Sequence, residues 1–216
     1  MAGKWGVIVV DMQGDFTEWK KGSLAVPGSD ERYVRNVEIA TRRFSDMGLP
    51  IFGSQDWHPP NHISFATSHP GRRPLDVITI DGRTQVLWPP HCVQGTEKAR
   101  ILIDNNLFLA VVKKAQSPAI DSYSAFQDEG GTKTELETML RTNGVERLII
   151  YGLATDYCVR ATALDGLSAG YRVTIVEDLC RGVSPDTTSS ALAEMKKKGV
   201  RLVPSLEGMI EKIGAP

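Results

Sequence analysis

The chain has 216 residues, of which 41% are hydrophobic and 24% charged, and its formal net charge is -1 at pH 7. This balance excludes an electrostatic attraction of the whole molecule to nucleic acid or to an acidic membrane, and no apolar run reaches the length of a membrane span. The length fits one large α/β domain, 1–216, and neither a linker nor an internal repeat divides it.

Six short apolar runs predict strands. The runs are nearly continuous rather than alternating, as expected of parallel strands that are covered on both faces. In chain order they are 7–10, 51–52, 107–112, 148–151, 173–176 and 200–203.

Apolar residues at helical spacing separate these runs, and a glycine ends each helical pattern. The predicted helices cover 33–47, 136–140, 158–169 and 191–195, and the glycines that end them are Gly48, Gly144, Gly170 and Gly199. The alternation of strands and helices predicts an α/β fold, a doubly wound parallel six-stranded sheet with helices on both faces.

The cysteines and the N-terminal segment indicate where the protein is located. Cys92, Cys158 and Cys180 form an odd and sparse set, which is typical of reduced thiols in a cytosolic protein. The apolar run at 7–10 is too short for the core of a signal peptide. We therefore expect a cytoplasmic protein.

One connection, 54–95, is unusually long and has no convincing helix. It contains six of the 12 prolines and all four histidines of the chain. Loops of this length in compact domains are usually functional or disordered, and the histidines favour a functional loop.

Reactive side chains follow four of the predicted strands. In chain order they are Asp11, Asp56 with His58, Lys113 with Lys114, and Cys158. Ligands bind parallel sheets beyond the carboxyl ends of the strands, so these side chains are expected at one edge. A carboxylate, an ammonium and a thiol that converge there make an acyl-transfer site.

The position of Cys158 favours a nucleophile. It follows the strand at 148–151 and begins a predicted helix, whose N-terminal dipole stabilises a thiolate, so we expect an exposed thiol of low pKa. A buried, inert cysteine is the alternative. A Cys–His pair with His58, His62 or His91 is also open.

The long loop favours a metal site. Asp56 and His58 are two residues apart, so in an extended segment both face the same ion. The third ligand is His91 or His62. Three nitrogen and oxygen ligands with positions left open are typical of a catalytic metal rather than a structural one.

Six motifs spread over nearly the whole chain carry a resemblance to a known family. They are 10–16 (VDMQGDF), 22–26 (GSLAV), 55–65 (QDWHPPNHISF), 87–96 (LWPPHCVQGT), 121–126 (DSYSAF) and 152–159 (GLATDYCV). On these motifs the chain resembles the isochorismatase-like cysteine hydrolases, and within them the nicotinamidases (pyrazinamidases). The first and last motifs are specific for the superfamily, and the two histidine motifs and 121–126 for nicotinamidases.

The resemblance implies a catalytic triad of Asp11, Lys114 and Cys158 on the isochorismatase-like hydrolase fold. The family usually has glycine after this lysine, where this chain has Ala115. The resemblance also implies an oxyanion hole made by the N–H groups of Ala154 and Cys158, with a cis peptide between Leu153 and Ala154.

The metal and substrate contacts are likewise implied by the resemblance. It implies one divalent ion, usually Zn²⁺ with Fe²⁺ or Mn²⁺ in some members, held by Asp56, His58 and His91. The substrate-binding residues that it implies are Phe16, Leu24, His62, Trp88, Tyr123, Leu153 and Ala154.

The activity that follows is hydrolysis of nicotinamide, and also of pyrazinamide, to the acid and ammonia in NAD salvage. The expected partner is this small-molecule substrate, with no nucleic acid and no membrane, while assembly into a homo-oligomer is left open. The alternatives are another cysteine amidohydrolase of the superfamily, such as an N-carbamoyl or ureido amidase, or a catalytically inactive small-molecule binding protein on the same fold.

Overall fold

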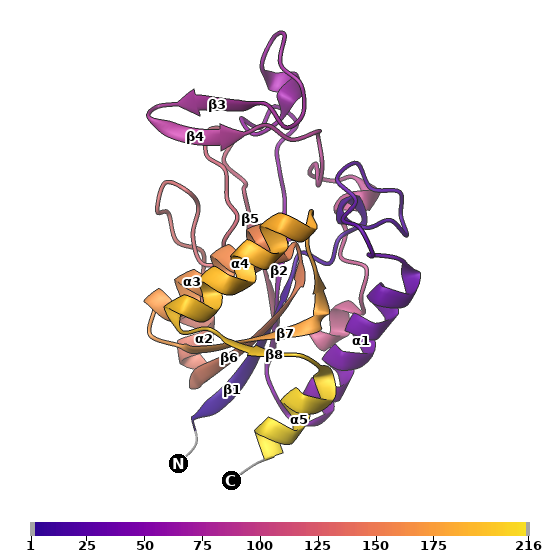
Figure 1. Cartoon of the computed structure of the whole chain (residues 1–216), viewed down its shortest axis with the longest axis vertical. Helices are drawn as coiled ribbons and strands as arrows, with labels where there is room; N and C mark the ends of the chain where they lie inside the picture. The colour runs from indigo at the N-terminus through magenta and orange to yellow at the C-terminus, as the bar shows by residue number, and fades with distance from the viewer. Residues whose placement is uncertain (1–2, 215–216) are drawn as a thin grey trace.

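Six parallel strands form the central sheet of the computed structural model, which describes residues 3–214 (Figure 1). The strand order is β5-β2-β1-β6-β7-β8. The strands are β1 (Lys4–Val10), β2 (Ile51–Asp56), β5 (Ala110–Lys114), β6 (Val145–Leu153), β7 (Arg172–Arg181) and β8 (Arg201–Val203). Each of the six predicted runs overlaps one of these strands, and the predicted parallel sheet is confirmed.

The direction of winding reverses at the centre of the sheet. β1 pairs with β2 on one side and with β6 on the other. The chain winds outward from β1 to β2 and β5, then returns to β6 and winds the other way to β7 and β8. The carboxyl ends of β1 and β6 therefore flank a topological switch point, the usual ligand site of such sheets.

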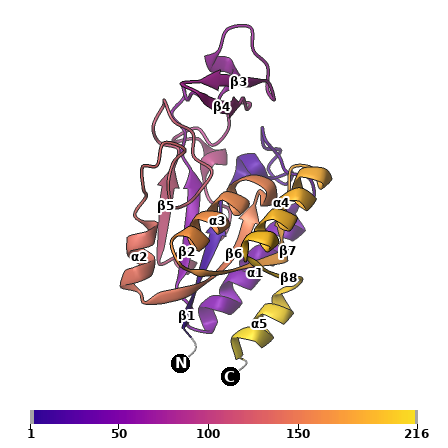
Figure 2. The same ribbon diagram turned by 60° about the vertical axis from the view of Figure 1, so that its left-hand side comes forward.

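Helices cover both faces of the sheet, as predicted (Figure 2). α1 (Glu31–Asp46) and α5 (Leu206–Gly214) share one face, where Arg43 and Glu207 form an ion pair of 2.7 Å. α2 (Leu136–Thr142), α3 (Arg160–Ser168) and α4 (Pro185–Lys198) lie on the other. The sequence analysis missed α5, although Leu206, Met209 and Ile213 have helical spacing. None of the helices within 3–214 combines the length and hydropathy that a membrane span requires.

The long connection 54–95 holds an antiparallel hairpin that the sequence analysis missed. Its strands are β3 (Val77–Ile80) and β4 (Arg83–Val86), and it projects beyond the carboxyl ends of the central strands (Figures 1 and 2). Asp81 and Gly82 form the turn with φ of 49° and 77°. Positive φ at both central residues fits a type I′ hairpin turn, for which Asp-Gly is a preferred pair.

Candidate active site

The structure brings the predicted triad together at the switch point of the sheet. Asp11 follows β1, Lys114 ends β5, and Cys158 lies between β6 and α3. All three are buried, with exposed fractions of 0%, 2% and 6%. Asp56 ends β2 beside them, so four strand ends contribute to one site.

The ammonium of Lys114 is the centre of the cluster. Its Nζ lies 3.0 Å from Asp11 Oδ2, donates a hydrogen bond to Asp56 Oδ1, and donates another to the Ser122 carbonyl at 3.1 Å. The same atom lies 3.4 Å from Cys158 Sγ. Burial alone would lower the pKa of Lys114, but the two carboxylates raise it well above its usual range. Lys114 therefore stays charged at neutral pH.

The neighbouring lysine is separated from the cluster by strand geometry. Successive side chains of β5 point to opposite faces, so Lys113 turns away, and its Nζ lies 4.1 Å from the centroid of the Trp57 ring. The residue after Lys114, Ala115, has φ of 54°. Glycine adopts this left-handed conformation most easily, which explains why a glycine suits this position.

Asp11 is placed to accept a proton. Its Oδ1 accepts a hydrogen bond of 2.6 Å from Ser54 Oγ, whereas within the described residues Oδ2 has the Lys114 ammonium beside it, at 3.0 Å, and no further hydrogen-bond partner. An oxygen of Asp11, an oxygen of Asp56 and Cys158 Sγ all lie within 4.8 Å of one another. Burial raises the pKa of Asp11, and the Lys114 ammonium opposes this shift. A raised pKa makes this carboxylate a stronger base toward a thiol.

Cys158 differs from the prediction in its exposure and its pKa. The predicted exposed thiol is wrong, because the side chain is only 6% exposed. Burial raises the pKa of Cys158 well above its usual range, although Lys114 lowers it. The thiol also lies in a π-helical turn, Thr155–Val159, that precedes α3 rather than in the first turn of α3 itself. The resting form is therefore the neutral thiol, and deprotonation needs a base within the site.

The peptide bond between Leu153 and Ala154 is cis, as the resemblance implied. Ala154 lines the cavity in front of Cys158. Leu153 is fully buried at the end of β6 and is not among the cavity-lining residues.

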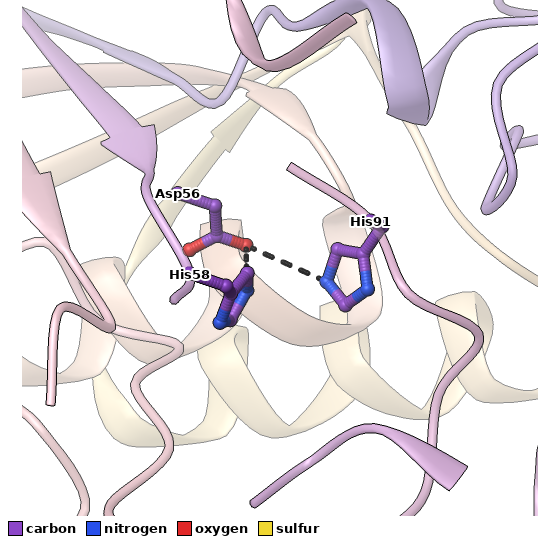
Figure 3. A group of neighbouring side chains, drawn as sticks. All are labelled: Asp56, His58 and His91. Carbon is purple, nitrogen blue, oxygen red and sulfur yellow. Dashed lines mark ion pairs between the residues drawn. The ribbon is translucent and has the colours of Figure 1, made fainter. Parts of the chain in front are cut away.

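Asp56, His58 and His91 form a group of potential metal ligands (Figure 3). Both imidazoles turn toward the same carboxylate oxygen, with Asp56 Oδ2 lying 3.5 Å from His58 Nε2 and 3.9 Å from His91 Nε2. One donor atom from each residue lies within 4.8 Å of the others. The spacing of residues in the sequence left His91 and His62 open as the third metal ligand. The structure puts His91 in this group.

The chemistry of this group fits a divalent metal ion. His58 is 1% exposed, yet neither of its ring nitrogens has a hydrogen-bond partner within residues 3–214. His91 Nδ1 lies 2.8 Å from the Pro89 carbonyl, so Nδ1–H donates there and leaves the Nε2 lone pair toward Asp56. Burial and the neighbouring His58 lower the pKa of His91 to about 4, so the ring is neutral at pH 7. Buried imidazole nitrogens without partners are rare unless they bind an ion or water.

Gln13, which the sequence analysis did not select, holds Asp56 in place. Its Nε2 donates to the Asp56 carbonyl and its Oε1 accepts from the Asp56 N–H, both at 2.8 Å. The same Nε2 donates to the Ala99 carbonyl at 2.8 Å. The signals available in the sequence were its position two residues after Asp11 and its place in the motif 10–16.

His62 packs against His58, with ring centroids 4.4 Å apart, and is not among the residues that line the cavity. Its Nδ1 lies 2.7 Å from Ser64 Oγ and its Nε2 3.2 Å from the Ile120 carbonyl. His58, His62 and Asp121 form a second group of donor atoms within 4.8 Å. Because both nitrogens of His62 already have partners, this second group fits a metal less well than the first.

Aromatic side chains wall a narrow cavity that Cys158 and the metal-ligand group also line. Four of the residues that the resemblance assigns to substrate binding line it, which are Phe16, Leu24, Trp88 and Tyr123. Trp88 Nε1–H donates to Tyr123 OH at 3.2 Å, which fixes two of the rings. The sequence analysis missed five further lining residues, which are Val26, Asp121, Ser122, Tyr157 and Val183.

A cavity with flat aromatic walls suits a planar ring. Trp88 and Tyr157 meet edge to face, with centroids 5.1 Å apart. Cys158, His58 and His91 all line this cavity, so a ring bound there lies beside both the thiol and the metal-ligand group.

Comparisons with known proteins show what this chain is similar to. The Isochorismatase domain model matches residues 6–205. The chain is 42% identical to the nicotinamidase of Escherichia coli (strain K12) over 204 residues, 91% of this chain and 92% of that protein. A nicotinamidase/pyrazinamidase structure from Acinetobacter baumanii superposes with a TM-score of 0.87 at 33% identity, covering 97% and 99% of the two chains. The pyrazinamidase of Pyrococcus horikoshii, solved in complex with zinc, gives 0.77 at 39% identity, covering 93% and 98%.

Proposed function

The chain belongs to the isochorismatase family, and on that basis we propose that it is a nicotinamidase, which hydrolyses nicotinamide to nicotinate and ammonia and also accepts pyrazinamide. One observation carries the proposal. The buried ammonium of Lys114 contacts Asp11, Asp56 and Cys158, and Cys158 lines the same aromatic cavity as the Asp56, His58 and His91 donor group.

The reaction begins with the neutral thiol. Asp11 takes the proton of Cys158 as Sγ attacks the carboxamide carbon. The Lys114 ammonium, 3.4 Å from Sγ, stabilises the negative charge as the proton leaves.

The second step expels ammonia. The N–H groups of Ala154 and Cys158 donate to the oxyanion of the tetrahedral intermediate. Asp11 returns its proton to the amide nitrogen, the carbon–nitrogen bond breaks, and a thioester with Cys158 remains. Asp11 then takes a proton from the water that attacks the thioester and returns it to Cys158 Sγ as the carbon–sulfur bond breaks. The acid that is released loses its proton to solvent as nicotinate, and the Asp11 carboxylate and the Cys158 thiol are restored.

Asp56, His58 and His91 would hold one divalent ion, and their mixed carboxylate and imidazole donors suit Zn²⁺, with Fe²⁺ or Mn²⁺ as alternatives. When bound, such an ion supplies a Lewis acid for the ring nitrogen of the substrate. Phe16 and Trp88 hold the faces of the ring, so that the carboxamide points toward Cys158.

The free energy needed to bury the charged residues around Cys158 argues against the alternative of an inactive binding protein. Two carboxylates and an ammonium are buried against a thiol, and desolvation of such charges is expensive. A protein that only binds a neutral ring gains nothing from that arrangement.

Ammonia release from nicotinamide tests the proposal. The unmodified chain, loaded with Zn²⁺, should release ammonia and nicotinate in equal amounts. Cys158→Ala should lose turnover while Cys180→Ala, a change of another buried thiol that does not line the cavity, should keep it. Release of ammonia by Cys158→Ala at the unmodified rate would reject the covalent mechanism.

A further inference from the structure

Asp15 is a buried acidic residue that the proposed mechanism does not use. It lies in a short 3-10 turn after β1, Gly14–Phe16, and is only 7% exposed. It forms no ion pair within residues 3–214, and it belongs neither to the cavity lining nor to the groups of potential metal ligands. A buried carboxylate without an ion pair has to be stabilised by hydrogen bonds.

The hydrogen bonds of Asp15 connect it to two other segments of the chain. Its Oδ2 accepts a hydrogen bond of 2.8 Å from the Cys92 N–H. Its Oδ1 accepts one of 3.3 Å from the Ser23 N–H and lies 3.2 Å from Ser23 Oγ. Ser23 Oγ also donates to the Pro90 carbonyl at 2.7 Å. Asp15 and Ser23 together therefore hold the backbone on both sides of His91.

The segment that carries His91 depends on such contacts for its shape. His91 lies outside the helices and strands, and Cys92 has φ of 46°, a conformation that residues other than glycine adopt rarely. The Cys92 N–H donates to Asp15, and the Cys92 carbonyl accepts from the His58 N–H at 3.0 Å. The peptide groups of Cys92 are thus fixed from two sides, and they determine where the preceding residue, His91, points.

The same loop after β1 holds a second metal-ligand residue. Gln13 bonds the backbone of Asp56, and Asp15, two residues later, bonds the backbone next to His91. Groups that hold a ligand in the orientation for binding raise the affinity for the metal, because less freedom is lost when the ion binds.

We propose that Asp15 is a positioning residue for His91. By fixing the Cys92 backbone, its carboxylate keeps His91 Nε2 turned toward Asp56 Oδ2, the arrangement drawn in Figure 3. This inference rests on the proposed divalent metal site at Asp56, His58 and His91. Asp15 itself is not a ligand in this account, because both of its oxygens already accept hydrogen bonds from the protein.

Zn²⁺ binding to the metal-free full chain, measured by competition with a chelating dye, tests the proposal without any substrate. Asp15→Ala should weaken Zn²⁺ binding by at least about tenfold, the scale found for residues that orient metal ligands. Asp156→Ala is the matched control, since Asp156 is 8% exposed and accepts backbone N–H bonds from Val183 and Ser184, outside the metal-ligand segments. It should keep the affinity for Zn²⁺. Equal affinities of the Asp15→Ala and Asp156→Ala variants would overturn the proposal.

Asp15→Asn separates positioning from the negative charge of Asp15. The asparagine oxygen can still accept from the Cys92 N–H, while its amide can donate to Ser23 Oγ. Zn²⁺ affinity should therefore stay within about threefold of that of the unmodified chain. A loss as large as that of Asp15→Ala would show that charge, not the hydrogen bond to Cys92, decides the affinity, and would contradict the proposal.

Ser23→Ala covers the case in which Asp15→Ala does not fold. Ser23 is exposed, and its hydroxyl holds the Pro90 carbonyl on the other side of His91. The variant should weaken Zn²⁺ binding by about threefold, the scale of one hydrogen bond. If Asp15→Ala cannot be measured, unchanged binding by Ser23→Ala would overturn the proposal.

The double variant shows whether Asp15 acts through His91. In the His91→Ala background, Asp15→Ala should weaken Zn²⁺ binding little further, because the ligand that it positions is gone. An equal loss in both backgrounds would contradict positioning of His91. If His91→Ala alone left Zn²⁺ binding unchanged, the proposed metal site would be wrong at His91, and the role of Asp15 would fall with it. A loss with His91→Ala but none with Asp15→Ala would reject the role of Asp15 alone.

Discussion

Lys114 Nζ lies 3.0 Å from Asp11 Oδ2, and both side chains are buried. The pair joins the ends of β5 and β1, two strands that do not pair with each other in the sheet. Because the same ammonium contacts Asp56 and approaches Cys158, it couples the proposed acid–base pair to the metal-ligand group. A substitution at any one of these residues should therefore change the electrostatic environment of the others.

Asp11→Asn and Lys114→Met should each reduce kcat by at least about 10²-fold, the scale of general-base loss. The double variant should lose much less than the product of the single losses, because the two residues act as one unit. Steady-state ammonia release measures the three values, with circular dichroism as the control for folding. Independent, multiplicative losses would contradict a shared proton-transfer unit.

His91→Ala should weaken metal binding by at least about tenfold, since even changes around a ligand cost 10–100-fold. His69→Ala is the matched control, because His69 Nε2 bonds the Ile63 carbonyl and the residue is outside the donor group. Metal content after dialysis against a graded chelator measures both. Chelation should stop turnover but preserve the far-ultraviolet spectrum, because the sheet has its own core. Equal metal retention by both variants would count against His91 as a ligand.

Gly152→Ala should destabilise the fold by about 3 kcal/mol or more. Gly152 has φ of 129°, and a Cβ there would meet the Val10 carbonyl oxygen at 2.2 Å. Gly48→Ala is the control, since its φ is 78° but no atom lies within 4 Å of the added Cβ, so it should cost only about 1–2 kcal/mol. Urea denaturation compares the two. Equal losses would show that backbone strain, not the close approach of β1 and β6, decides the cost.

Most of the fold follows from local patterns in the sequence. The runs at 7–10 and 148–151 became central strands because continuous apolar stretches suit parallel strands with both faces covered. The hairpin of β3 and β4 could also be predicted, because four β-branched residues are followed by Asp81-Gly82. The surrounding prolines and histidines, however, favoured a loop without strands.

What the sequence could not supply depends on contacts between distant segments. Cys158 is buried, and the cavity beside it is lined by residues far from it in the chain, such as Trp88 and Tyr123. The hydrogen bonds between the Gln13 side chain and the Asp56 backbone require the register of β1 beside β2. Neither relationship leaves a periodic signal.

Benzamide should be hydrolysed about 10³-fold less efficiently than nicotinamide, as when a polar group in a site is left without its partner. It has the same shape and stacks equally well on Phe16 and Trp88, but has no ring nitrogen to offer to the Asp56, His58 and His91 side of the cavity. Pyrazinamide keeps that nitrogen and should remain a substrate. Comparable kcat/KM for benzamide and nicotinamide would show that the cavity selects by shape alone.

Mass spectrometry of an acid-quenched reaction tests the covalent mechanism most directly. Acid protonates Asp11 and preserves a thioester, so nicotinamide mixed with the loaded enzyme should leave a nicotinoyl group on the peptide that contains Cys158. Cys92 and Cys180 are also buried and serve as internal controls that should stay unmodified. A nicotinoyl adduct confined to Cys158, formed and lost at rates that match turnover, is the result we predict. Full turnover without any adduct on Cys158 at the earliest quench times, or an adduct on Cys92 or Cys180 instead, would contradict it.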